Sequence, residues 1–171
     1  DIYGAQFCYL LAEPEFGNYS DEDARLVLLG TSNQKPFKAF ASDDAIIMTE
    51  VYEFARSLSD ENFFIAPLQR FKFLLAGQML DCSMQLKCLL YCEQIAKCIV
   101  ARPDEFDVNF IMKVYGLADR LKFYDPVMEK SYEDNFNNNG VEGVEDPKWL
   151  QDLLASVSYT HLRAHETGRN L

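Results

Sequence analysis

The sequence predicts an all-α fold, an irregular α-solenoid of antiparallel helix pairs, and three observations lead to this prediction. One stretch, 83–101, is apolar around almost its whole helical circumference, so it has to lie between other helices. Several other stretches combine one apolar face with a capping residue. The expected helix starts at Asp43, Pro67, Met84 and Val108 are 24, 17 and 24 residues apart. That spacing is too uneven for a tetratricopeptide array of about 34 residues per repeat.

The stretch 83–101 is the expected central helix. At about 3.6 residues per turn its apolar side chains form one broad stripe, and only a narrow line of polar residues remains. Ser83 is the expected N-cap, and Pro103 marks the end. The stripe consists of Met84, Cys88, Cys92, Ile95 and Ile99, widened by Leu89, Tyr91, Ala96 and Val100, and the polar line consists of Lys87, Gln94 and Lys97.

The chain before residue 42 is predicted to contain one helix end and one short helix. Residues 2–12 indicate the end of a helix, because no cap precedes them and Pro14 and Gly17 follow. In 20–30, SDEDARLVLLG, a serine followed by acidic residues favours a short helix, although the run LVLL would also suit a short strand. A polar loop broken by a proline is expected over 31–41.

Two amphipathic helices are predicted between residues 43 and 81. Ser42 is the expected N-cap of the first, which ends near Leu58, and Asp43 and Asp44 suit its positive N-terminus. Its expected apolar stripe is Ile47, Val51, Phe54, Ala55 and Leu58, with Glu50, Glu53 and Arg56 off that stripe. The second helix opens at Pro67, and its Gly77 is expected to permit close approach of another helix. Its apolar face is Leu68, Phe71, Leu75 and Met79.

The remaining chain is predicted to contain two helices and an acidic loop. Asp107 caps a helix with the apolar face Phe110, Ile111, Val114, Ala118 and Leu121. Asp125–Pro126 is the expected start of a short turn. Because 129–145 is acidic, rich in asparagine and without a period, we expect a mobile loop there. Asp146–Pro147 then opens a last helix, with Trp149, Leu150, Leu153, Leu154 and Val157 buried.

We expect residues 1–157 to form one partial helical domain. The chain begins within a helical pattern, so we expect its natural start to lie upstream. The final stretch, 158–171, has no apolar stripe and resembles translated adapter or vector sequence. We expect it to be a non-native read-through tail and leave it out of the predicted fold.

Composition and charge argue against several classes of function. Hydrophobic residues make up 49% of the 171 residues, enough for a folded core. A net charge of −11 argues against binding to nucleic acid or to an anionic lipid surface, since both require a basic footprint. No apolar run approaches the roughly 18–20 residues of a membrane span. The number of cysteines, five, is odd, and four of them lie on or beside one apolar helix, which favours free, buried thiols over disulfides.

The sequence offers no convincing catalytic or metal-binding set. Cys88 and Cys92 lie one turn apart and could bind a metal, but the further ligands would have to be His161 and His165 from the tail. Buried thiols are therefore favoured. Carboxylates that are neighbours in the sequence are expected to cap helices or to face solvent rather than to act as an acid and a base. Most aromatic residues recur at the spacing of the buried face of a helix, which favours a role in the core. No glycine-rich phosphate loop or nucleophile motif is present, so we predict a protein without enzymatic activity, catalytic residues or cofactor.

Seven motifs occur in an order and spacing that point to one family. They are ARLVLLG (24–30), FAS (40–42), TEVYEFARSL (49–58), PLQRFKFLLAGQMLDC (67–82), LLYCEQIAKCIV (89–100), LKFYDP (121–126) and PKWL (147–150). Together they resemble the central conserved domain of the Sec-sixteen family, the scaffold of COPII vesicle formation at endoplasmic-reticulum exit sites. The resemblance covers about residues 7–157.

The resemblance implies a non-enzymatic scaffold with the helical solenoid of an ancestral coatomer element. It places the protein peripherally on the cytoplasmic face of the endoplasmic reticulum or on Golgi-proximal membranes. Its implied partners are the β-propeller protein Sec-thirteen, the coat subunit Sec-twenty-three and a second copy of itself. A second hypothesis is a peptide-binding α-solenoid adaptor unrelated to coats, which would need a groove of exposed polar and aromatic residues. The motifs do not indicate which residues contact a partner.

Overall fold

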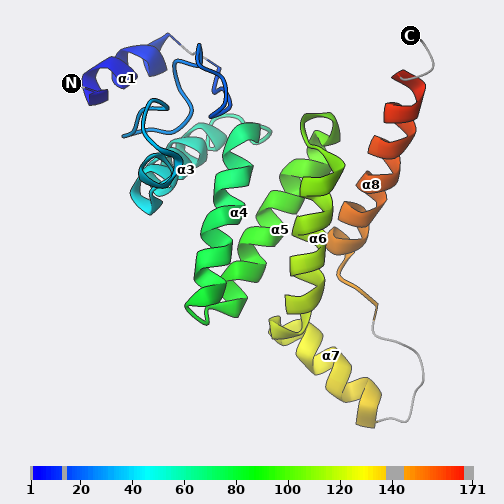
Figure 1. Cartoon of the computed structure of the whole chain (residues 1–171). Helices are drawn as coiled ribbons and strands as arrows, with labels where there is room; N and C mark the ends of the chain where they lie inside the picture. The colour runs from blue at the N-terminus through cyan, green and yellow to red at the C-terminus, as the bar shows by residue number, and fades with distance from the viewer. Residues whose placement is uncertain (1, 13–14, 138–144, 168–171) are drawn as a thin grey trace. The chain divides into compact units, whose positions relative to one another are not determined.

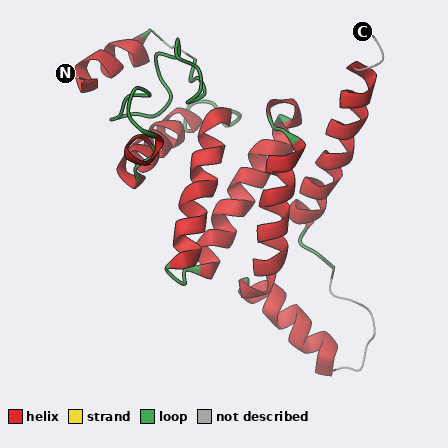
Figure 2. Ribbon diagram, in the orientation of Figure 1, coloured by secondary structure: helices red, strands yellow, loops and turns green. Residues whose placement is uncertain are grey.

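The computed structural model describes residues 2–12, 15–137 and 145–167, and in these ranges every regular element is helical (Figure 2). The all-α class is confirmed. The chain divides into two compact units, Asp1–Leu75 and Ala76–Leu171, which we describe separately. The elements are α1 (Ile2–Leu11), α2 (Phe37–Phe40), α3 (Asp43–Ser57), α4 (Ala66–Asp81), α5 (Gln85–Ala101), η1 (Pro103–Glu105), α6 (Val108–Leu121), η2 (Lys122–Tyr124), α7 (Pro126–Asn137) and α8 (Lys148–Thr167) (Figure 1).

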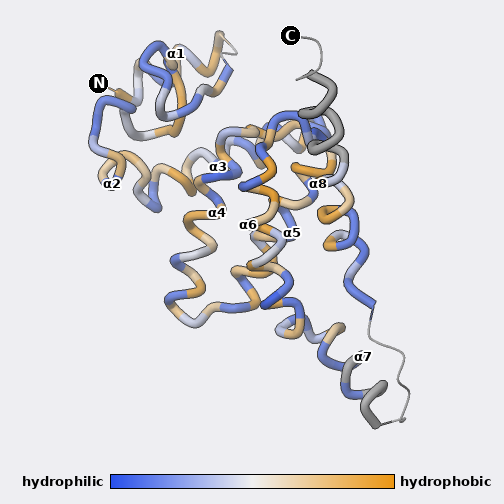
Figure 3. Tube along the Cα trace, turned by 45° about the vertical axis from the view of Figure 1, so that its right-hand side comes forward, coloured by the Kyte–Doolittle hydropathy of each residue, from blue (hydrophilic) through white to orange (hydrophobic). Residues whose placement is uncertain are grey.

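Helix α5 is the buried centre of the second unit. It packs against α6 and α8, which also contact each other (Figure 1). Hydrophobic and hydrophilic segments alternate along these helices, because each has a packed and a solvated side (Figure 3). The predicted burial is confirmed for the centre of the stripe, but Met84 and Val100, which were expected to belong to it, are 40% and 41% exposed, so α5 has a solvated side. The buried side chains are Cys88, Leu89, Cys92, Ile95, Ala96 and Ile99 of α5, Phe110, Ile111, Val114, Ala118 and Leu121 of α6, and Leu150 and Leu153 of α8.

The turn between α4 and α5 corrects the predicted role of Ser83. Its φ is 59°, in the left-handed region. Its N–H donates to the Leu80 carbonyl at 2.9 Å, and the Met84 N–H donates to the Met79 carbonyl at 2.9 Å. These two bonds form a Schellman motif that ends α4. Ser83 is therefore not the N-cap of the central helix; the connection is so short that this residue has to turn left-handed.

The short helix predicted over 20–30 is wrong, because the segment consists of turns, bends and irregular chain. The side chains at 26–29 are all buried, 6% exposed or less. A short helix on the surface would turn some of four consecutive apolar side chains toward solvent. An irregular segment buries all four, provided that its backbone polar groups find other partners.

Side chains of α1 and α3 supply those partners. The Gln6 amide nitrogen donates to the Leu28 carbonyl at 3.2 Å, and its oxygen accepts from the Gly30 N–H at 2.7 Å. The Thr49 hydroxyl accepts from the Leu29 N–H at 2.8 Å. Gly30 has φ 77°, a conformation that glycine adopts without strain. Hydrogen bonds from side chains of α1 and α3 thus stabilise the conformation of this segment.

Further expectations differ from the structure, among them the polar loop over 31–41, in which α2 forms and Phe40 is fully buried. Helix α7 occupies 126–137, where a loop was expected from residue 129, and residues 138–144 lie outside the described ranges. A β-carbon at Gly77 would meet no atom within 4 Å, so the close approach predicted there is wrong. Leu154 is 43% exposed, although it was expected to be buried. The backbone of α8 continues to Thr167, and the native or non-native origin of 158–171 stays a prediction.

Candidate protein-binding surfaces

Helix α3 is capped as predicted but buries a different face. Ser42 accepts a hydrogen bond from the Ala45 N–H at 3.4 Å. The side chains that α3 buries are Ala45, Ile46, Thr49 and Glu53, whereas Ile47, Val51, Phe54 and Leu58 of the predicted core stripe are 46%, 62%, 64% and 73% exposed. The prediction that this stripe belongs to the core is therefore wrong.

A buried polar network accounts for the orientation of α3. Oε1 of Glu53 accepts from the Ile65 N–H and from the Gln69 amide, both at 2.8 Å. Its other oxygen pairs with the ammonium of Lys72, which also lies 3.5 Å from Glu50. A buried ammonium without a counter-charge is costly, so α3 has to present Glu53 to α4. This requirement turns the apolar stripe outward.

The sequence contains a signal for this network. Glu50 and Glu53 are three residues apart, and so are Gln69 and Lys72. Residues at that spacing share one side of a helix. Two neighbouring helices, one with a pair of carboxylates and the other with an amide and an ammonium, can therefore pack polar side against polar side, which a hydrophobic pattern alone does not indicate.

Helix α1 carries a second exposed apolar row. Tyr3, Phe7 and Leu11 follow one another at intervals of four residues and are 59%, 62% and 71% exposed. A β-carbon on Gly30 would lie 3.3 Å from Sδ of Met48 and 3.6 Å from the Tyr3 ring, so Tyr3 of α1 and the 40% exposed Met48 of α3 both lie beside that glycine. Contiguous exposed apolar surface is typical of protein-binding sites. We call this set the apolar face: Tyr3, Phe7, Leu11, Ile47, Met48, Val51, Phe54 and Leu58.

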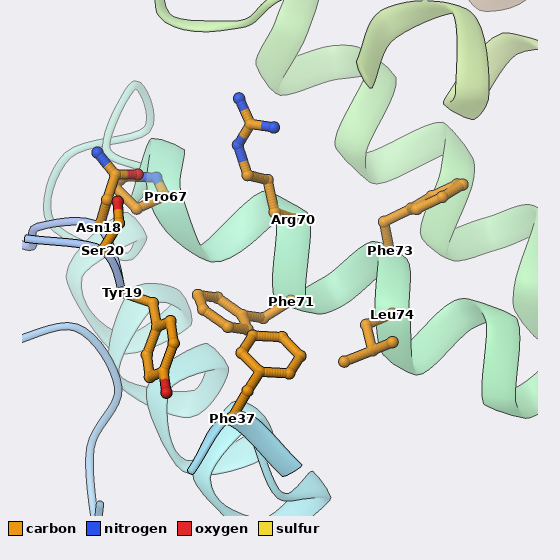
Figure 4. A pocket seen from close by; sticks show the side chains of 9 residues that line it. All are labelled: Asn18, Tyr19, Ser20, Phe37, Pro67, Arg70, Phe71, Phe73 and Leu74. Carbon is orange, nitrogen blue, oxygen red and sulfur yellow. The ribbon is translucent and has the colours of Figure 1, made fainter. Parts of the chain in front are cut away.

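The first unit also contains a pocket of about 520 Å³, which we call the aromatic pocket (Figure 4). The loop at 18–20, helix α2 and the first turns of α4 line it. Figure 4 shows the rings of Tyr19, Phe37 and Phe71 next to one another, with Arg70 on the same helix as Phe71. The lining residues are Asn18, Tyr19, Ser20, Phe37, Pro67, Arg70, Phe71, Phe73 and Leu74.

The thiols of Cys88 and Cys92 lie together, as their spacing predicts, and both are fully buried and free. Burial raises the pKa of the Cys88 thiol, although its hydrogen bond with Cys92 opposes the shift. Burial, followed by the charge of Cys88 and the hydrogen bond to it, raises the pKa of Cys92 to about 12. Thiols that stay protonated at neutral pH are poor nucleophiles and metal ligands. Cys8 and Cys82 are exposed, so the expectation of buried cysteines is wrong for those two.

The described residues contain no cluster of three or more His, Cys, Asp or Glu side chains that could hold a metal ion. The side chains of His161 and His165, the further ligands considered from the sequence, lie outside the described part of the structure. Of the described helices, none has the length and apolar character needed to cross a membrane.

Comparison with known proteins gives one consistent family. Residues 1–139 match the family model described as the Sec16 Sec23-binding domain. The chain is 34% identical over 149 residues to protein transport protein Sec16A of Homo sapiens, covering 87% of this chain and 6% of that protein. It is 34% identical over 167 residues to protein transport protein Sec16B of Oryctolagus cuniculus, covering 98% and 15%. The chain therefore spans a small part of these curated relatives. No solved structure matches it.

Proposed function

The chain belongs to the Sec16 family, the Sec-sixteen family that its motifs resemble, and from this premise we propose that it is a non-enzymatic scaffold segment of COPII coat assembly. It acts in transport from the endoplasmic reticulum to the Golgi, at exit sites, as a peripheral protein on the cytoplasmic face. The observation that carries the proposal is the match of residues 1–139 to a domain described as Sec23-binding. Family membership also favours this function over a peptide-binding adaptor unrelated to coats.

The coat subunit Sec23 contacts the apolar face. Two observations support this part of the proposal. The face lies entirely within the residues that match the Sec23-binding family model. It also carries two exposed aromatic rings, Tyr3 and Phe7, on α1 and a third, Phe54, on α3. Aromatic side chains are the usual anchors of protein interfaces, because they bury a large apolar area at a small entropic cost.

Two further contacts are part of the proposal because the family resemblance implies them. One is with the β-propeller protein Sec-thirteen, and the other is with a second copy of the chain. The residues that make these contacts are not assigned.

Calorimetric titration of Sec23 into the full chain tests the proposal. The double variant Val51→Asp, Phe54→Asp replaces two side chains that are 62% and 64% exposed. The matched control is Leu90→Asp, at a position on α5 that is 47% exposed. We expect the wild type and the control to bind alike and the double variant to bind at least about tenfold more weakly.

Two results would count against the proposal in different ways. If Sec23 does not bind the wild-type chain, the proposed function is wrong for this segment. If wild type and double variant bind equally, the chain binds Sec23 elsewhere and the assignment of the apolar face is wrong. Unfolding curves of all three proteins show whether each is folded under the conditions of the titration.

A further inference from the structure

The row that α3 contributes to the apolar face begins beside two exposed carboxylates. Asp43 lies four residues before Ile47, and Ile47 lies four residues before Val51, so the three side chains share one side of the helix. Asp44 lies four residues before Met48 in the same way. Both aspartates are exposed. A partner that covers this row therefore meets two negative charges at the first turn of α3.

Two more exposed carboxylates follow the other end of the row. Leu58 is its last apolar residue, and the chain turns directly afterwards, with the Asp60 N–H donating to the Arg56 carbonyl at 3.1 Å. The Asp60 side chain accepts a hydrogen bond from the Asn62 N–H at 3.0 Å, and both Asp60 and Glu61 are exposed. We call these four residues the acidic rim: Asp43, Asp44, Asp60 and Glu61.

Neighbouring residues do not balance the charge of the acidic rim. Residues 43–64 contain six carboxylates and one basic side chain, that of Arg56. The two carboxylates outside the rim, Glu50 and Glu53, belong to the buried polar network. The guanidinium of Arg56 lies 5.0 Å from the centroid of the Phe63 ring, and within the described part of the chain no residue forms an ion pair with the rim. Helix α1, the other half of the apolar face, has no charged side chain. The exposed charges that border the row on α3 are therefore all negative.

The position of the acidic rim specifies the chemistry of a complementary partner surface. At about 1.5 Å per residue, the two ends of α3 are about 22 Å apart, well beyond the screening length of about 8 Å at physiological salt. Each pair of carboxylates therefore acts on the part of the partner that lies next to it. A carboxylate at the edge of an interface loses part of its hydration, and a facing ammonium or guanidinium offsets this loss, whereas a facing carboxylate adds repulsion to it.

We propose that Sec23 contacts the apolar face through an apolar patch that has lysine or arginine side chains at both ends, and that these side chains pair with the acidic rim. This inference rests on the proposed function and adds the chemistry of the partner surface. Complementary charges at the edge of an interface act mainly on the association rate, because they steer the two proteins during their encounter. The acidic rim thus contributes specificity, whereas the aromatic rings of the apolar face supply buried contact area.

Stopped-flow association of Sec23 with the full chain tests this proposal. The rim variant neutralises the four carboxylates with side chains of the same shape: Asp43→Asn, Asp44→Asn, Asp60→Asn, Glu61→Gln. The matched control removes as many charges from exposed positions of the second unit: Asp81→Asn, Glu129→Gln, Glu133→Gln, Asp152→Asn. In about 50 mM NaCl we expect the association rate constant to fall at least about tenfold for the rim variant and less than about twofold for the control. The difference should shrink in about 300 mM NaCl, because salt screens these charges.

A second variant keeps the test decisive if the rim variant is unfolded in circular dichroism. Asp43 and Asp44 also stabilise the N-terminus of α3, whereas Asp60 and Glu61 lie beyond its end. The variant Asp60→Asn, Glu61→Gln keeps an acceptor for the Asn62 N–H and leaves α3 unchanged. It should lower the association rate constant at least about threefold, since the two ends of the rim act separately.

Four results would overturn the proposal. An unchanged association rate in the rim variant indicates an uncharged partner surface, a faster rate indicates an acidic one, and an equal decrease in the rim variant and the control indicates an effect of net charge alone. In these three cases the wild type still binds Sec23, so the proposed function stands. Absence of binding to the wild type contradicts the proposed function itself, and this inference with it.

Discussion

The carboxylate of Glu53 in α3 and the ammonium of Lys72 in α4 form an ion pair from which solvent is almost excluded, with side chains 8% and 6% exposed. Glu53 also accepts hydrogen bonds from the Ile65 N–H and the Gln69 amide. The pair fixes which face of α3 is buried. One contact therefore joins two helices of the first unit and leaves the apolar face exposed.

Replacing Glu53 by leucine is expected to lower the free energy of unfolding by about 3–5 kcal/mol, because it leaves the charge of Lys72 buried without a partner. Urea denaturation measures this loss. The control is Glu50→Gln, because the Glu50 carboxylate lies 3.5 Å from the Lys72 ammonium and its side chain is 23% exposed. This substitution should lower the free energy of unfolding by at most about 1 kcal/mol. The double variant Glu53→Leu, Lys72→Met should recover much of the loss. A cost below about 1 kcal/mol for Glu53→Leu would contradict a buried ion pair.

Ser83→Gly is expected to raise the free energy of unfolding by up to about 1 kcal/mol. A left-handed conformation costs a residue with a β-carbon about 1–2 kcal/mol, whereas glycine loses about 0.5–1 kcal/mol through its greater freedom when unfolded. The shift of the thermal midpoint measures the effect. Gln94→Gly, at an exposed position inside α5, is the control and should lower the free energy by about 1 kcal/mol. Equal losses for both variants would show that residue 83 is not left-handed.

The free energy of unfolding is expected to fall as pH rises above 9. The pKa of Cys92 is about 12 in the folded protein, against an ordinary value of 9.0. The unfolded chain loses this proton first, so unfolding releases a proton in that window and stability decreases by up to about 1.4 kcal/mol per pH unit. The raised pKa of Cys88 acts in the same direction.

Urea denaturation at pH 8.5, 9.5 and 10 measures this slope. Cys92→Ala should flatten it, although that variant is less stable at every pH because of the cavity it creates. Cys82→Ala, at an exposed position, should leave the slope as it is in the wild type. If Cys92→Ala and the wild type have the same slope, the thiol of Cys92 is not the group responsible.

Ile95→Ala is expected to cost about 2–5 kcal/mol, because the side chain is fully buried in α5 and its removal leaves a cavity. Lys97→Ala is the control on the same helix. The Lys97 side chain is 64% exposed and pairs with Glu93 at 2.8 Å, so its loss should change the free energy of unfolding by about 0.5 kcal/mol or less. Comparable costs for the two variants would contradict the assigned buried face of α5.

The second unit follows closely from the sequence because its helices are amphipathic in the ordinary sense. Asp107 caps α6, and all five predicted apolar residues of that helix, from Phe110 to Leu121, are buried. The turn at Ser83 is different. A serine before an apolar run suggests an N-cap, but the hydrogen bonds that decide its role come from the end of the preceding helix.

The first unit departs from the prediction because its decisive contacts are not local. The hydrogen bonds that hold 26–29 come from Gln6 and Thr49, on helices that precede and follow that segment. The orientation of α3 depends on Lys72, a residue of the next helix. For the same reason the apolar face could not be recognised as a binding surface, since five apolar residues at helical spacing ordinarily belong to a core.

Hydrogen–deuterium exchange of the full chain, with and without saturating Sec23, is the most direct test of the proposed scaffold function. Amides of Asp43–Ser57 in α3 should exchange more slowly in the complex, because bound Sec23 would cover the apolar face and suppress local opening. Amides of Val108–Leu121 in α6 should be unchanged and serve as the internal reference. Protection confined to α6, or no protection anywhere at saturating Sec23, would contradict the account.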